Sequence, residues 1–183
     1  NGEMACGEYG EGKMSSPRQI YKCLKDYFLN RDLVKNKKLK AIVTAGPTRE
    51  YLDPIRYISN ESSGKQGIEI ANSLSRLGVK TTLVLGPCDL SPNSDVKLIK
   101  IVSAKEMFEK VKKLLPVDIA ICSAAVSDIK PIFKNKKKLK KNIENIKNIK
   151  FTENPDILDF LSKSNKDRPK LVVGFSAETE NII

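Results

Sequence analysis

Residues 41–87 read AIVTAGPTREYLDPIRYISNESSGKQGIEIANSLSRLGVKTTLVLGP, and this stretch decides the fold. The run Ala41–Thr44 is typical of a short buried strand, and apolar residues recur at helical spacing from 64 to 77. Gly78 is placed to end that helix, and Lys80–Leu85 follows as a second strand. The order strand, helix, strand favours a parallel sheet that is covered by helices.

The alternation of strands and helices continues along the rest of the chain. Ser103 and Glu106 match the capping box that starts a helix, and Asn154 followed by Pro155 is typical of another helix start. The remaining expected elements are strands over 98–102, 117–121 and 171–175 and helices over 103–115 and 154–161. We therefore predict an α/β fold, a Rossmann-like three-layer sandwich with a mostly parallel sheet, with ligands bound beyond the carboxyl ends of its strands.

Five other stretches interrupt this pattern. Residues 1–14 form a glycine-rich loop, 17–29 place apolar residues on one face of a helix, and 30–38 are a polar linker. Residues 49–63 are a long loop, and 134–141 are a lysine-rich, flexible excursion. Because long loops in compact domains usually have a binding role, the loop at 49–63 is the first place to look for a site.

The composition of the 183 residues excludes several classes of protein. No apolar run is long enough to cross a bilayer, so we expect no membrane partner. Histidine is absent, which excludes Ser-His-Asp and Cys-His catalysis and any metal site built from histidine. The four cysteines are widely spaced, which favours neither a disulfide scaffold nor a zinc site and fits the reducing cytoplasm.

The net charge of +11 could indicate a polyanionic partner. The excess lysine comes with abundant asparagine and isoleucine, as in 134–150, and aromatic residues make up only 6% of the chain. Because binding of single-stranded nucleic acid relies on aromatic side chains for base stacking, we expect no nucleic-acid partner.

The loop before the first long helix has features of a phosphate site. Ser62, Ser63 and Gly64 lead into a helix N-terminus, where free backbone N–H groups and the helix dipole attract phosphate. The loop is neither a Walker A sequence nor a G-x-G-x-x-G fingerprint. The alternative interpretation is that these small residues only form turns.

The segment GPTREYLDPIRYISNESSGKQG (46–67) closely resembles the signature of bacterial-type phosphopantothenoylcysteine synthetase, that is, phosphopantothenate–cysteine ligase. The resemblance continues in order through CSAAVSD (122–128), KKLKK (137–141), ENPDIL (153–158) and VVGFSAET (172–179), and it covers essentially all of 40–183. It implies a homodimeric enzyme that uses CTP and Mg²⁺. In the reaction that the resemblance implies, the carboxylate of 4′-phosphopantothenate attacks the α-phosphate of CTP and expels pyrophosphate, which gives an acyl-cytidylate. The amino group of L-cysteine then attacks this anhydride and releases CMP.

The resemblance assigns catalytic roles to two residues. Asn60 corresponds to the family's asparagine that contacts the acyl-cytidylate, where an amide can donate to an oxygen on which charge develops. Lys138 corresponds to the first lysine of the family's K-x-K-K motif and would stabilise charge at the α-phosphate. On the residues alone, Asn60 could cap a loop and Lys138 could belong to a solvated segment.

The resemblance also implies two sets of binding residues. The nucleotide-binding set is Ser123, Ala124, Ala125, Asp128, Lys138, Asn154, Pro155, Asp156, Ile157 and Phe175. The phosphate- and substrate-binding set is Gly46, Arg56, Ser62, Ser63 and Gly64. Asn154 could serve as a helix cap, and Arg56 could either meet a phosphate or pair with Glu50 or Asp53. The ligands of the metal stay unknown.

The N-terminal stretch ACGEYGEGKM (5–14) resembles the end of the flavin-dependent phosphopantothenoylcysteine decarboxylase, which precedes the ligase in many bacterial polypeptides. This implies a decarboxylase remnant at 1–29, a linker at 30–38 and the ligase domain at 39–183, with FMN in the part of the decarboxylase that is missing here. Cys6 corresponds to its proton-donating cysteine; without the resemblance it is a chance free thiol. Since the ligase pattern continues past the last residue, we expect weaker nucleotide binding than in a longer protein.

Two other functions stay open on the residues alone. A nicotinamide-dependent oxidoreductase domain would suit the sheet, although the short glycine-rich turn is absent. A basic nucleic-acid-binding module would suit the net charge. Titration with NADPH and the salt dependence of DNA binding would distinguish these functions from a ligase.

Overall fold

The computed structural model describes residues 2–3, 9–10, 39–139, 148–163 and 166–175. The chain divides into two compact units, Asn1–Lys37 and Lys38–Ile183. In the first unit β1 (Gly2–Glu3) pairs antiparallel with β2 (Tyr9–Gly10). Cys6, the helix expected over 17–29 and the linker over 30–38 lie outside the described residues.

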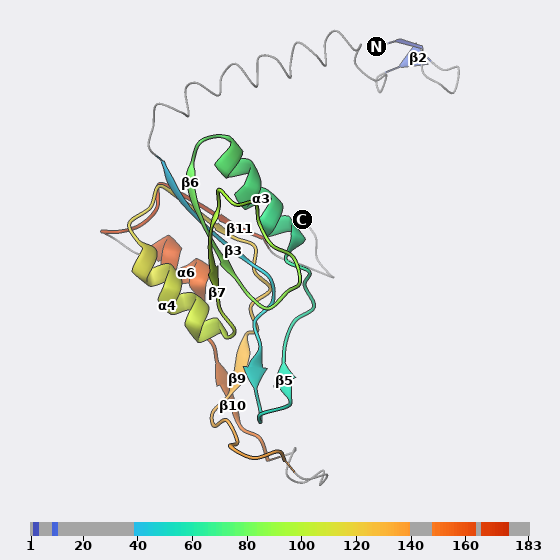
Figure 1. Ribbon diagram of the computed structural model, residues 1–183, viewed down its shortest axis with the longest axis vertical. Coiled ribbons are helices and arrows are strands. Elements are labelled where there is room, and N and C mark those ends of the chain that lie inside the picture. Colours follow the sequence, from blue (N-terminus) through green and yellow to red (C-terminus); the bar gives the residue numbers. More distant parts are fainter. Residues whose placement is uncertain (1, 4–8, 11–38, 140–147, 164–165, 176–183) are drawn as a thin grey trace. The chain divides into compact units, whose positions relative to one another are not determined.

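The second unit is built on a five-stranded sheet in which every pairing is parallel. In spatial order its strands are β11 (Leu171–Gly174), β8 (Ile119–Cys122), β3 (Lys40–Ala45), β6 (Lys80–Leu85) and β7 (Lys97–Lys100). The chain builds the sheet outward from β3 to β7 and then returns to β8 on the other side (Figure 1). The strand order therefore reverses between β3 and β8, where doubly wound folds bind their ligands.

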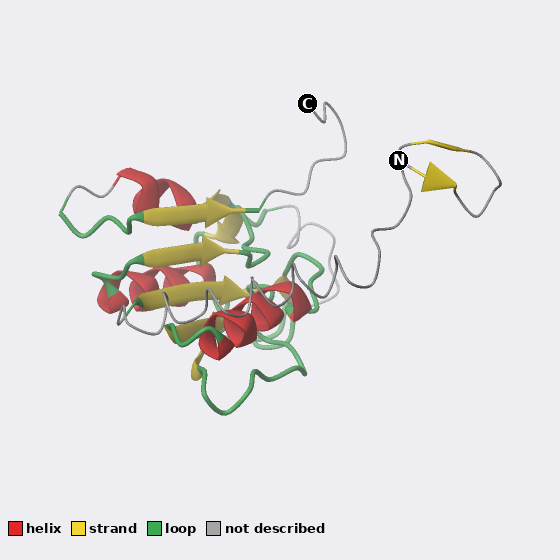
Figure 2. Ribbon diagram, turned by 90° about the horizontal axis from the view of Figure 1, so that it is seen from above, coloured by secondary structure: helices red, strands yellow, loops and turns green. Residues whose placement is uncertain are grey.

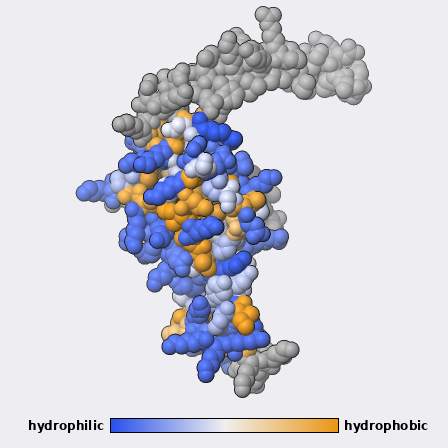
Figure 3. Space-filling view, viewed as in Figure 1, coloured by the Kyte–Doolittle hydropathy of each residue, from blue (hydrophilic) through white to orange (hydrophobic). Residues whose placement is uncertain are grey.

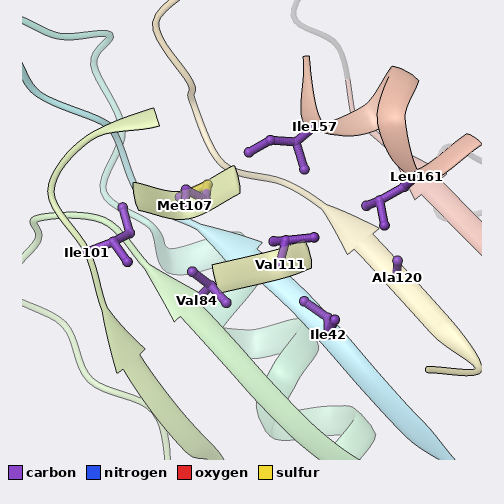
Figure 4. Close-up of a cluster of buried hydrophobic side chains, with 8 residues drawn as sticks. All are labelled: Ile42, Val84, Ile101, Met107, Val111, Ala120, Ile157 and Leu161. Carbon is purple, nitrogen blue, oxygen red and sulfur yellow. The ribbon is translucent and has the colours of Figure 1, made fainter. Parts of the chain in front are cut away.

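Helices cover both faces of this sheet, as Figure 2 shows, which confirms the predicted three-layer α/β sandwich. Helix α3 (Lys65–Arg76) packs on one face, and α4 (Ala104–Leu114) and α6 (Ile157–Lys163) pack on the other. Alternate side chains of β3 serve the two layers, since Val43 packs with the α3 side and Ile42 with the α4 and α6 side. Figure 4 shows the second of these clusters.

The observed helix ends confirm one predicted cap and contradict another. At α4, the Ser103 hydroxyl accepts from the Glu106 N–H (3.2 Å), as expected for a capping box. The helix expected from Asn154 begins instead at Ile157, with the Asp156 carboxylate accepting from the Asp159 N–H (2.8 Å). Asn154 does not cap it: a cap uses the side-chain oxygen as acceptor, and the Asn154 oxygen has no hydrogen-bond partner among the described residues, while its amide nitrogen donates to the Ser127 carbonyl.

Two pairs of short strands, both unforeseen, form an arm that projects beyond the carboxyl edge of the sheet (Figure 1). The loop expected over 49–63 contains β4 (Glu50–Tyr51), which pairs antiparallel with β5 (Tyr57–Ile58). β9 (Ile129–Pro131) pairs antiparallel with β10 (Phe151–Glu153) on either side of the lysine-rich stretch. β4 lies beside β9, so the two pairs are joined.

The face of the molecule in Figure 3 is mostly hydrophilic, with apolar side chains gathered between α3 and α4 and again on the arm. The exposed apolar residues of the arm include Phe133, which is 82% exposed, together with Ile132 and Phe151. No helix among the described residues is long and apolar enough to cross a membrane.

Candidate functional site

Strands β3 and β8 stay paired beyond their carboxyl ends, at the point where the strand order reverses. The Ser123 N–H and hydroxyl both donate to the Thr44 carbonyl (3.1 and 2.7 Å). The Ala125 N–H donates to the Gly46 carbonyl (2.9 Å), and the Thr48 N–H donates to the Ala125 carbonyl (3.3 Å). This pairing joins the segments that follow the two strands, and one cavity lies on each side of it.

The first cavity lies on the α6 side of this pairing and has a volume of about 460 Å³. It brings together seven predicted nucleotide-binding residues: Ala124, Asp128, Asn154, Pro155, Asp156, Ile157 and Phe175. Three segments that are far apart in the sequence supply them, after β8, before α6 and after β11. The Phe175 N–H donates to the Cys122 carbonyl (3.1 Å), which fixes the third segment to the first.

Three members of the nucleotide-binding set do not line this cavity. Ser123 lies against α3, because a Cβ on Gly67 of that helix would overlap the Ser123 hydroxyl. Ala125 takes part in the pairing with Gly46, and Lys138 is an exposed side chain on the arm. Their predicted contacts with a nucleotide stay predictions.

Hydrogen bonds hold the wall of the first cavity in place. The Asn154 side-chain amide donates to the Ser127 carbonyl (2.8 Å), and its backbone N–H donates to the Asp128 carbonyl (2.8 Å). The buried Thr48 hydroxyl accepts from the Ser127 N–H (3.0 Å). The Asn154 side-chain oxygen is buried and has no hydrogen-bond partner in the part of the chain that the structure describes.

The charge of the first cavity is one-sided. Asp128, Glu153 and Asp156 line it, and no lysine or arginine does so among the described residues. Carboxylates accept hydrogen bonds from hydroxyl and amino groups but repel phosphate. The cavity therefore suits the base and ribose of a nucleotide better than its phosphate chain.

Asn60 connects the long loop to the first cavity. Its side-chain amide donates to the carbonyl of Val126, which lines that cavity (2.9 Å). This bond spans 66 residues of sequence, so Asn60 does not act as a local loop cap here. An amide nitrogen carries two N–H donors, and the bond to Val126 uses one of them.

The second cavity lies on the β6 and β7 side and has a volume of about 780 Å³. It contains Ser62 and Ser63 from the predicted phosphate-binding set, together with Arg49 and Lys100. Asp89 is the acidic residue among those that line it, so cations prevail. This cavity therefore suits an anionic group. A phosphate, which Ser62 and Ser63 are predicted to bind, is such a group.

Gly46 and Gly64 lie against each other between the strand ends and the N-terminus of α3. Both have left-handed backbone angles (φ 75° and 72°), and a Cβ on Gly64 would lie 3.3 Å from the Gly46 Cα. The serine hydroxyls accept nearby N–H groups, Ser62 from Gly64 (3.2 Å) and Ser63 from Lys65 (3.4 Å). Part of the donor capacity of this helix N-terminus is thus already used within the loop.

The structure decides the pairing left open for Arg56. Its Nε lies 3.8 Å from the Asp53 carboxylate, and Nη2 donates to the Leu139 carbonyl (3.1 Å). Glu50 is occupied elsewhere, since its carboxylate accepts from the Ala104 N–H at the start of α4 (2.8 Å). Arg56 therefore pairs with Asp53, and it meets the segment that carries Lys138 rather than either cavity.

Sequence reasoning missed several residues that line the first cavity, among them Thr44, Cys122, Ser127 and Glu153. Cys122, Ser127 and Glu153 lie inside the motifs CSAAVSD and ENPDIL. They would have been predicted if every residue of each motif had been assigned to the cavity. Thr44 is the last residue of the first predicted strand, so its position at a carboxyl end was the signal that could have included it. No group of three or more Cys, Asp or Glu side chains suited to a metal occurs in the described ranges.

Cys122 should react slowly with alkylating agents. Burial raises the pKa of its thiol to about 11; the Thr44 side chain opposes this through a hydrogen bond and Asp156 adds to it. At pH 8 such a thiol has about a hundredfold less thiolate than an ordinary cysteine. We expect iodoacetamide to modify Cys122 about a hundredfold more slowly in the native protein than in urea, as measured by peptide mass spectrometry. Equal rates in the two states would contradict the burial of this thiol.

Comparison with known protein families shows which family the chain belongs to. The family model for the DNA/pantothenate metabolism flavoprotein C-terminal domain (DFP) matches residues 36–183. The chain belongs to this family. The predicted α/β fold and the resemblance to the ligase domain are both confirmed by this match and by the relatives below.

The DFP domain has close curated and structural relatives. The whole chain is 39% identical over 183 residues to the coenzyme A biosynthesis bifunctional protein CoaBC of Haemophilus influenzae, covering 100% of this chain and 45% of that protein. The chain thus spans about half the length of the curated relatives it matches. The crystal structure of the C-terminal domain of a CoaBC matches with a TM-score of 0.68 and 37% identity, over 80% of this chain and 68% of that one.

A third relative supports the fold. A variant of Cab2 in complex with phosphopantothenate-cysteine matches with a TM-score of 0.59 at 17% identity, over 87% of this chain and 70% of that one. At this identity the likeness concerns the fold alone.

Proposed function

We propose that this DFP domain joins 4′-phosphopantothenate to L-cysteine with CTP, through an acyl-cytidylate, as the ligase part of a longer cytoplasmic CoaBC-type protein. The observation that carries the proposal is that seven predicted nucleotide-binding residues line one cavity at the carboxyl edge of the sheet. The names of the relatives support the pathway, and the Cab2 complex contains phosphopantothenate-cysteine, the product of such a reaction. The family assignment favours this function over the oxidoreductase and the nucleic-acid-binding module.

The two cavities suggest how the substrates are arranged. The base and ribose of CTP occupy the acidic first cavity, with Phe175, which is 48% exposed, available to pack on the base. The phosphate groups lie toward the cations Arg49 and Lys100 and the serines of the second cavity. Asn60 lies beside the first cavity. One N–H of its side-chain amide donates to the Val126 carbonyl, and the other donates to the oxygen on which charge develops during acyl transfer.

Mg²⁺ is compatible with this arrangement, because proteins usually hold it with one or two carboxylates and the phosphates of the substrate. On the side where the phosphates are placed, Asp89 of the second cavity has the required chemistry. The ion would neutralise charge on the phosphates. FMN belongs to the decarboxylase part of the longer protein, in which Cys6 is proposed to donate a proton.

Turnover by the full-length protein tests this function. We expect pyrophosphate release from CTP only when 4′-phosphopantothenate is present, and formation of 4′-phosphopantothenoylcysteine, detected by mass spectrometry, once L-cysteine is added. CTP should support a higher kcat/KM than ATP. Release of pyrophosphate without 4′-phosphopantothenate, or product formation without a nucleoside triphosphate, would contradict the proposed reaction.

Lys138→Gln tests the role of the lysine-rich segment. We expect loss of the activation step, with kcat lower by roughly 100-fold, because the uncharged side chain cannot stabilise charge at the α-phosphate. Lys136→Gln is the matched control, since this neighbouring lysine is equally exposed and has no assigned role. Pyrophosphate release measures both variants, and equal losses would show that only the general charge of the segment matters.

We also propose that the protein is a homodimer, as the resemblance to the ligase family implies. The exposed apolar side chains Ile132, Phe133 and Phe151 make the arm a suitable contact surface. Sedimentation of the full-length protein should give a dimer, and Phe133→Glu should weaken it.

A further inference from the structure

Asp53 is a buried carboxylate that neither cavity uses. Its side chain is 0% exposed and lies in the turn between β4 and β5. One carboxylate oxygen accepts from the N–H groups of Ile55 and Arg56 (both 2.8 Å), and the other accepts from the Leu139 N–H (3.1 Å). Burial alone would raise the pKa of this carboxyl, but the three N–H groups and the Arg56 guanidinium hold it below its ordinary value.

The peptide group of Leu139 is held from both sides. Its N–H donates to Asp53, and its carbonyl accepts from Arg56 Nη2 (3.1 Å), whose guanidinium faces the same carboxylate. A second attachment lies four residues earlier, where the Asn135 N–H donates to the Leu52 carbonyl (2.9 Å). Residues 135–139 are therefore fastened at both ends to the turn between β4 and β5.

Lys138 lies inside this fastened stretch, directly before Leu139. A lysine side chain has a long flexible stem, so the position of its ammonium depends on where its backbone is held. The three residues before Lys138 (135–137) are exposed and polar, whereas Leu139 is half-buried and lines a small cavity with Phe133 and Ile149. The hydrogen bonds of Asp53 and Arg56 hold the Leu139 peptide group itself, and so they fix the direction of the backbone next to this lysine.

We propose that Asp53 is a positioning residue of the ligase reaction: through the Leu139 peptide it holds the backbone from which Lys138 reaches the nucleotide. This inference rests on the proposed function, in which Lys138 acts at the α-phosphate. Asp53 lines neither cavity, so its effect on the reaction passes through its contacts with Leu139 and with Arg56, which itself donates to the Leu139 carbonyl.

Asp53→Asn separates the two tasks of this carboxylate. The remaining oxygen can still accept from Ile55 and Arg56, so the turn keeps its shape. The new NH₂ group then faces the Leu139 N–H and the Arg56 guanidinium. All three groups are hydrogen-bond donors, so no hydrogen bond to the Leu139 N–H can form. The substitution therefore removes the attachment of Leu139 with little change in volume.

The control is Asp118→Asn, at the opposite edge of the sheet. Asp118 also accepts from a distant backbone N–H, that of Lys40 (3.0 Å), and from a cation, Lys170 (3.0 Å). It is therefore matched to Asp53 in its hydrogen-bond partners, but its side chain is 24% exposed, against 0% for Asp53, and it does not contact the lysine-rich segment in the described part of the chain. We expect its kcat to stay within about twofold of the parent protein.

The experiment is a double-mutant cycle on the full-length protein with Asp53→Asn, Lys138→Gln and the combination, together with hydrogen exchange of the peptide that contains Leu139. We expect Asp53→Asn to speed exchange at Leu139 at least tenfold. It should lower kcat by roughly 10- to 100-fold and leave the KM for 4′-phosphopantothenate within twofold. In the Lys138→Gln background it should lower kcat less than twofold further.

The two ways of failing can be told apart. A normal kcat for Lys138→Gln would overturn the role proposed for this lysine and, with it, the positioning role of Asp53. An unchanged exchange rate at Leu139, or losses of kcat that multiply in the double variant, would overturn the positioning role alone. A general loss of folding in Asp53→Asn would appear as faster exchange throughout the sheet, and it too would count against a role confined to Leu139.

Discussion

Asn60→Asp should stop the ligase after activation, so that the acyl-cytidylate accumulates while the amide product does not. The new carboxylate has no N–H to donate to the Val126 carbonyl or to an acyl oxygen, and it places a negative charge beside the acidic first cavity. Loss of one donor of this kind costs roughly 100- to 1,000-fold in kcat. Pyrophosphate release should fall much less than product formation, which a quenched-flow experiment with radiolabelled CTP can measure.

Asn135→Asp is the matched control for this substitution. The Asn135 side-chain amide also donates to a backbone carbonyl, that of Leu52 (3.4 Å), and its backbone N–H donates to the same carbonyl (2.9 Å). The segment should therefore stay attached after the substitution, with product formation within about twofold of the parent protein. If Asn60→Asp forms product at the normal rate, the catalytic role proposed for Asn60 is wrong.

Gly86→Ala should destabilise the whole second unit. A Cβ at this position would overlap the carbonyl oxygen of Pro47, which belongs to the backbone and cannot turn aside. The loop after β3 is fixed by its pairing with the segment after β8, so the strain cannot be relieved locally. We expect a loss of about 3 kcal/mol in the free energy of unfolding, which lowers the melting temperature by about 6–12 °C.

Gly174→Ala is the control, since this glycine also ends a strand of the same sheet. The three atoms nearest to a Cβ there all belong to the side chain of Leu158, which is 38% exposed and can change its rotamer. We expect a loss below about 1 kcal/mol, measured by urea unfolding of the two variants side by side. Equal stabilities for the two variants would show that the loop after β3 can move.

The central sheet and its helices could be predicted because their signals are local. The apolar runs of β3 and β6 and the periodicity of α3 are each contained in one short window. The strands of the arm have no such signal, since they are two or three residues long and depend on partners elsewhere in the chain. β9 and β10, for example, pair across the entire lysine-rich stretch.

In the candidate site, too, features that depend on neighbouring residues could be predicted, and features that depend on distant contacts could not. The motifs named most of the residues that line the first cavity, because each motif follows a strand or precedes a helix. The start of α6 was misplaced because Asn154, Asp156 and their neighbour Pro155 are all suited to a helix N-terminus. Only the contacts of Asn154 with Ser127 and Asp128 decide between them, and these come from another part of the chain.

The continued pairing of β3 and β8 limits how this protein can change during evolution. Ala41 faces Ile119, Thr44 faces Cys122 and Pro47 faces Ala125, so one alignment holds from inside the sheet to the rim of the first cavity. An insertion or deletion in either segment would move every following residue out of step with its partner and would break the hydrogen bond between the Ser127 N–H and the Thr48 hydroxyl. These two segments should therefore keep their length and change only by substitution.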